Sequence, residues 1–349
     1  ILRANGGFLI LDVMDVLRSP GAWEALMRAV RTGAAEITED GLVGLATLKG
    51  SKYYVPAKVK VVLIGSPMIR MLLSQNDDSF ASAFNAAAEF DSTLPVSPES
   101  ISGYLDFLKT AVGLSAGHIL DLSRGAISAV LELSARLVDS NKKLTAQFGA
   151  LYGILREATF WAKEAGHVEV TRADIESALE ARKDRNGGHA KRVMDIYLKD
   201  IFHVATSGVE VGQINGLAVM GDFGVPARVT VTASAGTPGI VSIDREAGST
   251  GSSFNKALGV VEGFLRNTFA QKKTLSAHIR ISFEQQYGGI DGDSATSTEI
   301  YGILSRLSGV PIKQSFAVTG SADQFGTVQA IGGVNEKIEG FFALAKARG

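Results

Sequence analysis

The spacing of hydrophobic and polar residues changes twice along the chain. Up to about residue 94, short apolar runs flank an amphipathic segment. From 95 to 205 apolar residues recur every three or four positions, and beyond 206 they alternate with polar residues. Apolar residues three or four positions apart are typical of helices, and alternation of apolar and polar residues is typical of strands. We therefore expect an α/β fold with three parts: an α/β module over residues 1–94, a helical subdomain and linker over 95–205, and a mixed α/β domain over 206–349.

Two apolar runs near the start end in an acidic or a small polar residue. Residues 6–12 (GGFLILD) end in Asp12, and residues 59–66 (VKVVLIGS) end in Ser66. Short uninterrupted apolar runs are typical of parallel strands that are buried on both faces. Between them the spacing predicts an amphipathic helix. Its apolar face comprises Ala22, Leu26, Ala29 and Val30.

The middle stretch predicts several helices with recognisable starts. Ser97 followed by Pro98 is a typical helix start, and Thr171 with Asp174 three residues later matches a capping box. The charged residues 181–192 lack interleaved aromatic residues, so they favour a solvated helix face or linker over a nucleic-acid site. Two helices have apolar series: Leu131, Leu133 and Leu137 in one, and Phe148, Leu151, Ile154, Leu155, Ala158 and Ala162 in the other.

In the last stretch, two strands and an intervening helix lead to a glycine-rich turn. Alternating apolar residues predict the strands, and apolar residues three or four apart predict the helix. The second strand runs into residues 287–294 (YGGIDGDS), so we expect a sheet to support Ser294. The apolar positions are Ala227, Val229, Val231 and Ala233 in one strand, Leu275, Ala277, Ile279, Ile281 and Phe283 in the other, and Ala257, Leu258, Val261, Phe264 and Leu265 in the helix.

Ser294 stands where the glycine-rich turn gives way to a helix, which Gly309 stops. A helix N-terminus offers unpaired backbone N–H groups and the positive end of the helix dipole, both of which stabilise the oxyanion formed when serine attacks a carbonyl. From this turn alone, a simple N-cap serine is the better supported interpretation. The apolar face of the helix comprises Ile300, Ile303, Leu304 and Leu307.

Lys337, 43 residues after Ser294, shifts the balance toward chemistry. It borders the apolar face of a predicted helix that Asn335 can cap. A lysine at the margin of an apolar face loses solvent, which lowers its pKa and makes the neutral amine available as a general base for a serine hydroxyl. The alternative is a lysine whose stem covers the core while its ammonium stays in water. The expected apolar face comprises Ile338, Phe341, Phe342 and Ala345.

Residues 283–342 resemble the proteolytic domain of Lon proteases, especially the B-type and the related C-type, ATP-independent members. The motifs that carry the resemblance are YGGIDGDS, AVTG and GGVNEK. The resemblance implies that Ser294 is the nucleophile, that Lys337 is its general base and that Thr319 orients the lysine amine. We expect the backbone N–H groups around Asp293 and Ser294 to form the oxyanion hole. The Asp293 carboxylate should point away from Lys337, because a negative charge there would hold the amine protonated.

The N-terminal strands resemble the Walker B and sensor 1 strands of an AAA+ module, and residues 95–205 resemble its helical lid. Asp12 and Ser66 would then be the nucleotide-binding positions. Asp12, however, is followed by Val13 instead of glutamate, and Gln147 stands where the family often carries arginine. The sequence contains no GxxxxGK[ST], and its nearest glycine-rich candidate, GSTGSS at residues 248–253, lacks Gly-Lys. We expect a degenerate AAA+ module, or a P-loop that precedes Ile1 in a longer parent chain.

Composition and simple motif searches limit the classes of cofactor and partner that we expect. The formal net charge of −1 gives no general attraction to nucleic acid or anionic membranes. The absence of cysteine excludes disulfides and thiolate metal sites, and the five histidines form no HExxH pattern, so no metal is expected. The sequence has no apolar run of membrane-spanning length and no signal-peptide pattern. We therefore expect a cytoplasmic protein that neither binds nucleic acid nor inserts into a membrane.

These observations predict a serine endopeptidase with a Ser-Lys dyad that degrades unfolded proteins without ATP hydrolysis or any required cofactor. Two alternatives remain. One is an ATP-dependent Lon protease whose nucleotide site is completed by residues before Ile1, and the other is a non-catalytic, chaperone-like ring. By the same resemblance we expect a homo-oligomer, a hexameric ring whose active sites face an internal chamber, with unfolded polypeptides as substrates.

Overall fold

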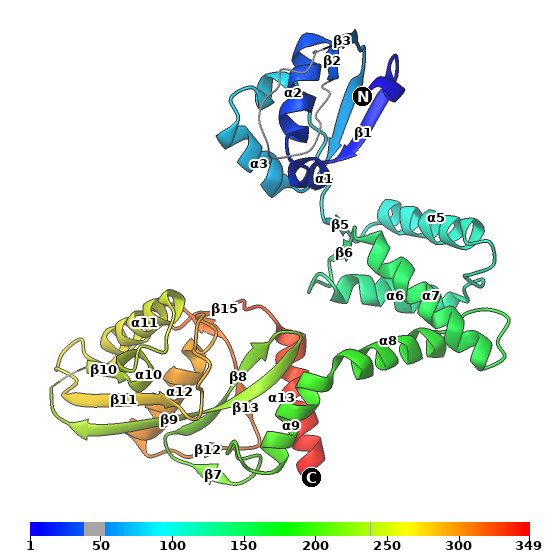
Figure 1. Cartoon of the computed structure of the whole chain (residues 1–349). Coiled ribbons are helices and arrows are strands. Elements are labelled where there is room, and N and C mark those ends of the chain that lie inside the picture. Colours follow the sequence, from blue (N-terminus) through cyan, green and yellow to red (C-terminus); the bar gives the residue numbers. More distant parts are fainter. Residues whose placement is uncertain (38–52, 238) are drawn as a thin grey trace. The chain divides into compact units, whose positions relative to one another are not determined.

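The computed structural model describes residues 1–37, 53–237 and 239–349 (Figure 1). Internal contacts divide the chain into two units, Ile1–Asp91 and Ser92–Gly349. Both units contain helices and strands, which confirms the predicted α/β class. Within the described ranges, no helix combines the length and hydrophobicity that a bilayer-crossing segment needs.

The N-terminal unit is built on two parallel strands, β1 (Phe8–Asp12) and β4 (Lys60–Ile64). The predicted helix between them is α2 (Ala22–Thr32), which buries Leu26, Met27 and Ala29. Phe80 packs close to Trp23 of that helix and adds to the small core. The other elements of the unit are η1 (Leu2–Ala4), α1 (Val13–Arg18), β2 (Ala34–Ile37), β3 (Tyr53–Pro56), α3 (Pro67–Asn76) and α4 (Phe80–Ala83).

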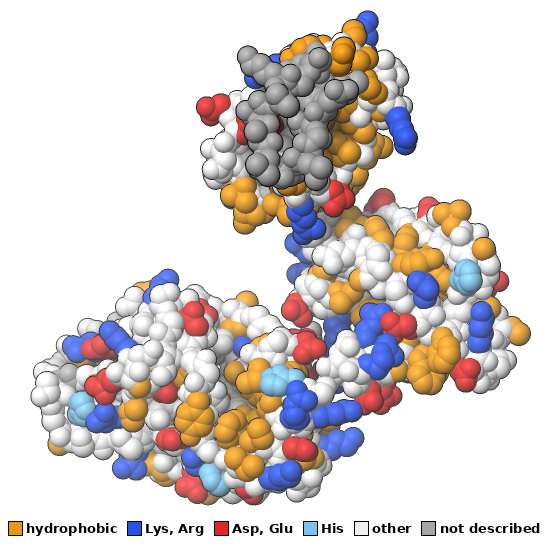
Figure 2. Space-filling view, viewed as in Figure 1, with side chains coloured by type: hydrophobic (Ala, Val, Ile, Leu, Met, Phe, Trp, Pro, Cys, Tyr) orange, Lys and Arg blue, Asp and Glu red, His pale blue; other side chains and the backbone are white. Residues whose placement is uncertain are grey.

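The parallel pairing of these strands is confirmed, but the expectation that both their faces are buried is wrong. Phe8 and Ile10 of β1 are 66% and 63% exposed, and Val62 and Ile64 of β4 are also exposed. Side chains alternate between the two faces of a strand, so one face of the pair lies open to solvent while the alternate residues are half-buried. Figure 2 shows hydrophobic side chains gathered at the surface of this unit.

The second unit begins with the predicted helices. Ser97 caps the first one, accepting a hydrogen bond from the Ser100 backbone N–H at 3.2 Å, and the capping box of Thr171 and Asp174 is formed as predicted. The elements are β5 (Thr93–Pro95), α5 (Pro98–Leu114), α6 (Arg124–Arg136), β6 (Lys143–Thr145), α7 (Phe148–Glu164), α8 (Arg172–Asn186) and α9 (Gly188–Leu198).

The core of this helical part matches the predicted face of α7 but not that of α6. In α7 the predicted series from Leu151 to Ala162 is buried. Leu137, the C-cap of α6, is exposed, and the leucines at 131 and 133 in the helix are only partly buried. Residues at i, i+2 and i+6 do not share a helical face, whereas the buried positions at i, i+3, i+4 and i+8 do. Those buried residues are Ala126, Ala129, Val130 and Ser134.

The C-terminal part contains a five-stranded sheet in the order β10-β11-β9-β8-β13 (Figure 1). The central pairs β8–β9 and β9–β11 are antiparallel, and the outer pairs β10–β11 and β13–β8 are parallel. The strands are β7 (Val209–Glu210), β8 (Gln213–Met220), β9 (Phe223–Ala235), β10 (Gly239–Ser242), β11 (Ala277–Phe283), β12 (Ile312–Lys313), β13 (Ala317–Val318), β14 (Ser321–Ala322) and β15 (Val328–Gln329). The helices are α10 (Ile243–Glu246), α11 (Ser252–Phe269), α12 (Thr296–Ser308) and α13 (Val334–Arg348).

The core of this part lies between the sheet and two helices. Alternate residues of β9 and β11 pack against α11 and α12, as the sequence predicts. β11 ends at Phe283 and leads through residues 284–293 to Ser294, so the sheet and the start of α12 hold the glycine-rich turn from both ends. The buried apolar residues include Val229, Val231, Phe254, Val261, Leu265, Ile279, Ile281 and Ile303.

Candidate functional site

Ser294 lies just before α12 and does not cap it. The helix begins at Thr296, and its N-cap is Ala295, which has no side-chain capping bond. The sequence-based alternative of a simple N-cap serine is therefore wrong. The Ser294 hydroxyl faces a different partner, since the Lys337 amine donates a hydrogen bond to its oxygen at 3.1 Å.

Lys337 is buried on the first turns of α13, with only 4% of its surface exposed. Burial lowers the pKa of its amine, because the charged form loses solvation. The charge of Asp293 acts in the opposite direction and is the smaller effect. The interpretation of a lysine that keeps its ammonium in water is therefore wrong, and a candidate nucleophile and a candidate base meet at hydrogen-bonding distance.

The helix that carries Lys337 packs differently from the sequence-based expectation. Asn335 does not cap α13, because the N-cap is Gly333, and Asn335 instead donates to the Asp139 carboxylate at 3.2 Å. Ile338 and Phe342, predicted to face the core, are 58% and 64% exposed. The residues of α13 that are buried are Lys337 and Leu344, at i and i+7.

Two glycines explain how α13 presents its lysine to the sheet. A Cβ atom added to Gly340 would lie 2.0 Å from the Gly224 carbonyl oxygen, and one added to Gly224 would lie 2.0 Å from the Glu336 carbonyl oxygen. Such distances are far below any real contact, so the backbones of α13 and β9 meet directly. This close approach, rather than an apolar stripe, places Lys337 next to Ser294.

Thr319 and Gly320 hold the backbone of the serine. The Thr319 hydroxyl donates to the Ser294 carbonyl oxygen at 3.2 Å, and the Gly320 N–H donates to the same oxygen at 2.7 Å. Thr319 thus lies in the site as predicted, but its hydroxyl is bonded to the peptide of Ser294. Its predicted action on the lysine amine stays a prediction.

Asp293 is held on the side of β14. Its carboxylate accepts a hydrogen bond from the Ser321 hydroxyl at 2.8 Å. Among the described residues, it forms no ion pair with Lys337, although its charge still acts on the lysine pKa. This is the arrangement that the sequence argument requires of an active dyad.

A cavity of about 500 Å³ opens beside the dyad and is lined mainly by glycine and apolar residues. Within the part of the chain that the structure describes, the backbone N–H groups of Asp293 and Ser294 donate to no protein acceptor. They are therefore available to a group bound in the cavity. Its lining includes Gly216, Leu217, Ala218, Val219, Ile290, Gly292, Ile331 and Gly332.

Three family models match the chain in sequence. The LonB-like AAA domain matches residues 1–91, the archaeal LonB AAA+ ATPase LID domain matches 121–185, and the Lon protease (S16) C-terminal proteolytic domain matches 190–346, which includes Ser294 and Lys337. The chain belongs to the Lon protease family.

Named relatives agree with this assignment. A putative Lon protease homolog of Escherichia coli (strain K12) is 29% identical, over 99% of this chain and 59% of its own length. The corresponding protein of Haemophilus influenzae is 28% identical, over 99% of this chain and 57% of its own. An archaeal Lon protease of Halobacterium salinarum is 28% identical, over 99% of this chain and 49% of its own. The chain thus spans between about half and three fifths of the length of these relatives.

Asp291 is a positioning residue of this Lon site that the sequence analysis did not single out. Its Oδ1 accepts from the N–H groups of Ser253 and Phe254, both at 3.1 Å, and of Gly292 at 2.8 Å. These bonds hold the pKa of the Asp291 carboxyl below its usual range. Residues 248–253 were the nearest glycine-rich candidate for a phosphate-binding loop. The end of this stretch instead binds a carboxylate of the chain itself. The available signal was an acid three residues before a serine that precedes a helix.

Asp12 and Ser66, the candidate nucleotide positions of the LonB-like AAA domain, both act as N-caps. Asp12 accepts from the Met14 N–H at 2.7 Å at the start of α1, and Ser66 accepts from the Ile69 N–H at 3.4 Å at the start of α3. Val13, which follows Asp12, is buried, and a Cβ on Gly65 would lie 2.4 Å from its Cγ1. Among the described residues of the Lon chain, no group of three or more His, Asp or Glu side chains could hold a metal ion.

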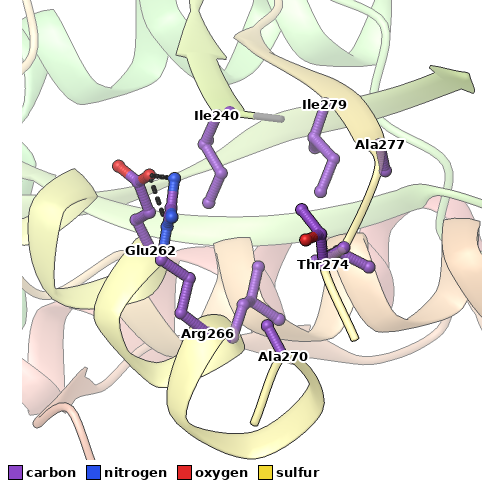
Figure 3. A pocket seen from close by; sticks show the side chains of 10 residues that line it. Ile240, Glu262, Arg266, Ala270, Thr274, Ala277 and Ile279 are labelled. Carbon is purple, nitrogen blue, oxygen red and sulfur yellow. Dashed lines mark hydrogen bonds and ion pairs between the residues drawn. The ribbon is translucent and has the colours of Figure 1, made fainter. Parts of the chain in front are cut away.

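A second pocket of the proteolytic domain lies away from the dyad. It has a volume of about 190 Å³ and is bounded by α11 and the strands β10 and β11 (Figure 3). Ile240 and Ile279 line it, and the ion pair between Glu262 and Arg266 stands beside it. It includes none of the residues around Ser294, so it is not part of the candidate site.

Proposed function

We propose that this chain is a serine endopeptidase of the Lon type whose catalytic dyad is Ser294 and Lys337. The observation that carries the proposal is the 3.1 Å hydrogen bond from a buried lysine amine to the hydroxyl of a serine at a helix N-terminus. Burial disfavours the ammonium form, and a neutral amine can accept the serine proton.

The first half of the reaction follows from this geometry. Ser294 Oγ attacks the carbonyl carbon of the scissile peptide while Lys337 Nζ takes its proton. The N–H groups of Asp293 and Ser294 donate to the oxyanion of the tetrahedral intermediate. Lys337 then returns the proton to the departing amine, which leaves an ester between Ser294 and the acyl part of the substrate.

The second half uses the same groups in reverse. Lys337 accepts a proton from a water molecule that attacks the ester carbonyl, and it returns that proton to Ser294 Oγ when the acid product leaves. Thr319 and Gly320 hold the peptide carbonyl of Ser294, so the hydroxyl keeps its direction through both steps. In this proposal Thr319 serves the dyad by positioning, with orientation of the amine as its second role.

We also propose that proteolysis needs neither ATP hydrolysis nor another cofactor. The support lies in the N-terminal unit, where Asp12 is engaged in capping α1 and the following Val13 is a buried apolar residue that cannot polarise water. An ATP-dependent Lon protease with a nucleotide site completed by residues before Ile1 is the alternative. A non-catalytic, chaperone-like ring is the other, which the contact between Ser294 and Lys337 disfavours.

Degradation of casein tests these proposals together. The chain is expected to degrade casein at the same rate with and without ATP, and Ser294→Ala and Lys337→Ala should each lose all measurable activity, because the two residues act as one unit. Gly259→Ala, in the open part of α11, is the matched control and should keep full activity. Near-full turnover by either dyad variant would contradict the mechanism, and a requirement for ATP would support the ATP-dependent alternative.

We propose that the chain acts on unfolded polypeptides in the cytoplasm as a closed homo-oligomer, a hexameric ring with internal active sites. An enclosed chamber supplies the selectivity that a dyad with an apolar cavity lacks, and a ring repeats one interface until it closes. The support is an exposed apolar row on α13, formed by Val334, Ile338 and Phe342. Sedimentation velocity measures the state, and an active monomer at working concentration would contradict the ring.

A further inference from the structure

Glu299 is an acid in the core that the proposed mechanism does not use. It lies on α12 five residues after Ser294, and its exposed fraction is 0%. Within the described residues, neither of its carboxyl oxygens has a hydrogen-bond partner. Burying such a group without a partner costs free energy in either charge state, and far more when it is ionised.

A second buried acid, Asp244 on α10, acts electrostatically on Glu299. Asp244 accepts a hydrogen bond from the Phe283 N–H at 2.9 Å, at the end of β11. The segment 284–293 follows Phe283 and leads to Ser294, and α12 with Glu299 comes next. The two acids therefore stand at the two ends of the segment that carries the nucleophile.

Few other charged groups face this pair. β8 and β14 contain no ionisable residue, and β9 contains only Arg228, which forms no ion pair among the described residues. On α11, Lys256 is exposed, and its other charged residues, Glu262 and Arg266, pair with each other. Glu284 acts on Asp244 with the same negative sign. No described cation therefore neutralises Glu299.

Burial, with the charge of Asp244 as a smaller cause, raises the pKa of Glu299 to about 8. Burial also raises the pKa of Asp244, although its hydrogen bond from Phe283 works against this. Glu299 is thus neutral at neutral pH. When it ionises, an unsolvated negative charge arises beside a second acid in the core, and both the desolvation and the repulsion are relieved if α12 separates from the end of β11.

We propose that Glu299 is a protonated positioning residue: its neutral carboxyl allows α12 and the Asp244-anchored end of β11 to pack together, and loss of its proton loosens the Ser294 segment and stops proteolysis. This inference rests on the proposed peptidase function. It makes the site sensitive to pH through two different groups. Lys337 must lose a proton for activity, whereas Glu299 must keep one.

The sign of the effect on stability follows from linkage. Below about pH 4.5, the ordinary value, Glu299 is protonated in both the folded and the unfolded chain. Between there and about pH 8 the folded chain keeps a proton that the unfolded chain loses, so stability falls as pH rises. Replacing Glu299 by a neutral isostere removes this fall, so the variant should gain stability over the wild type as pH rises.

The test is the pH profile of kcat/KM for a fluorogenic peptide, compared between wild type and Glu299→Gln. The wild-type profile should rise as Lys337 deprotonates and then fall about tenfold per pH unit above the Glu299 pKa. Glu299→Gln should keep the rise and lose the fall, and Asp244→Asn should move the fall to lower pH, because the charge that helps to raise the Glu299 pKa is removed. Glu262→Gln replaces a partly buried acid of the same domain that pairs with Arg266 away from the dyad; it is the matched control and should match the wild type.

A second measurement does not depend on the folding of a variant. Hydrogen exchange of the wild-type amides in residues 284–299 should speed up above pH 8 beyond the intrinsic effect of pH, while the amides of α11 should not. A wild-type profile without an alkaline fall, or a fall that persists in Glu299→Gln, would overturn the inference. Ser294→Ala separates the two proposals: if it abolishes activity at every pH while Glu299→Gln changes nothing, the peptidase stands and the role of Glu299 does not.

Discussion

Three strand-to-helix junctions of this chain carry a small polar or acidic residue, and they use it differently. In the N-terminal unit, Asp12 ends β1 and Ser66 follows β4, and the side chain of each accepts a hydrogen bond from a backbone N–H of the next helix. In the C-terminal part Ser294 stands at a similar junction, but Ala295 occupies the N-cap. The Ser294 hydroxyl is therefore not engaged in capping and receives the Lys337 amine instead.

This comparison shows that the position of the serine relative to the N-cap, a difference of one residue, decides whether its hydroxyl is free to react. A serine at the N-cap gives its oxygen to the helix, and a serine one position earlier keeps it. The backbone at Ser294 is fixed by other means, since Thr319 and Gly320 bind its carbonyl and Asp291 ties the preceding turn to α11. The site thus replaces a cap with contacts to two distant segments, residues 319–320 and α11.

The largest expected effect separates the two kinds of serine. Ser294→Ala should lose all proteolysis and leave the stability of the fold unchanged, because no cap is removed. Ser66→Ala should keep full proteolysis and lower the stability of the N-terminal unit by about 1 kcal/mol, the usual contribution of an N-cap. Casein degradation and urea unfolding of both variants measure the contrast. A loss of stability in Ser294→Ala as large as that in Ser66→Ala would show that Ser294 is a cap after all.

The next prediction concerns a substitution that moves Lys337, the hydrogen-bond partner of Ser294. Gly340→Ala places a Cβ 2.0 Å from the Gly224 carbonyl oxygen, so α13 must move and carry Lys337 away from Ser294. We expect a stability loss of about 1–3 kcal/mol for overpacking and about a hundredfold lower kcat, since misplacing a catalytic group by about 1 Å has that effect.

Gly259→Ala is the matched control for Gly340→Ala. It also lies inside a helix, but an added Cβ there meets no atom within 4 Å. Alanine is the better helix former by roughly 0.5–1 kcal/mol, so this variant should be slightly more stable and fully active. Equal behaviour of the two variants would mean that the close approach of α13 to β9 does not position Lys337.

The fold and the two residues that meet in the candidate site were predictable because their signals are local. Alternation along residues 227–233 and 277–283 predicted β9 and β11, and helical spacing predicted α11 and α12. Motif resemblance predicted Ser294 and Lys337. The packing of α13 was not predictable in this way, because Gly224 and Gly340 act through a contact between backbones that leaves no periodic pattern. The open face of β1 was missed for the related reason that burial depends on neighbouring elements.

The same limit applies to the carboxylates. Asp291, Asp293 and Glu299 lie within nine residues of one another, yet one binds backbone N–H groups, one binds Ser321, and one is buried without a partner. Sequence alone treats all three as acids near a serine. The pKa of Asp291 is lowered and that of Glu299 is raised by the segments that pack around them, which only the folded chain brings together.

The smallest expected effect concerns Asp293, which stands beside the free serine. Its charge raises the pKa of Lys337 against the larger lowering by burial. Asp293→Asn removes this charge while keeping an oxygen that can accept from Ser321, so the lysine pKa should fall. The rising limb of the kcat/KM profile should then move to lower pH by a fraction of a unit, with little change at its maximum.

Ser321→Ala should give the opposite shift. Without the hydroxyl that holds it at 2.8 Å, the Asp293 carboxylate is free to turn toward the Lys337 amine, where it favours the ammonium. The rising limb should therefore move to higher pH, and Asp293→Asn added to this variant should cancel the shift, because the two changes act on one charge. If Asp293→Asn instead moves the limb upward or removes activity altogether, Asp293 orients the base as a third member of the catalytic group. Ser294 would then differ from the N-cap residues Asp12 and Ser66 in two ways. It lies one position before the N-cap, and its reactivity depends on the adjacent acid.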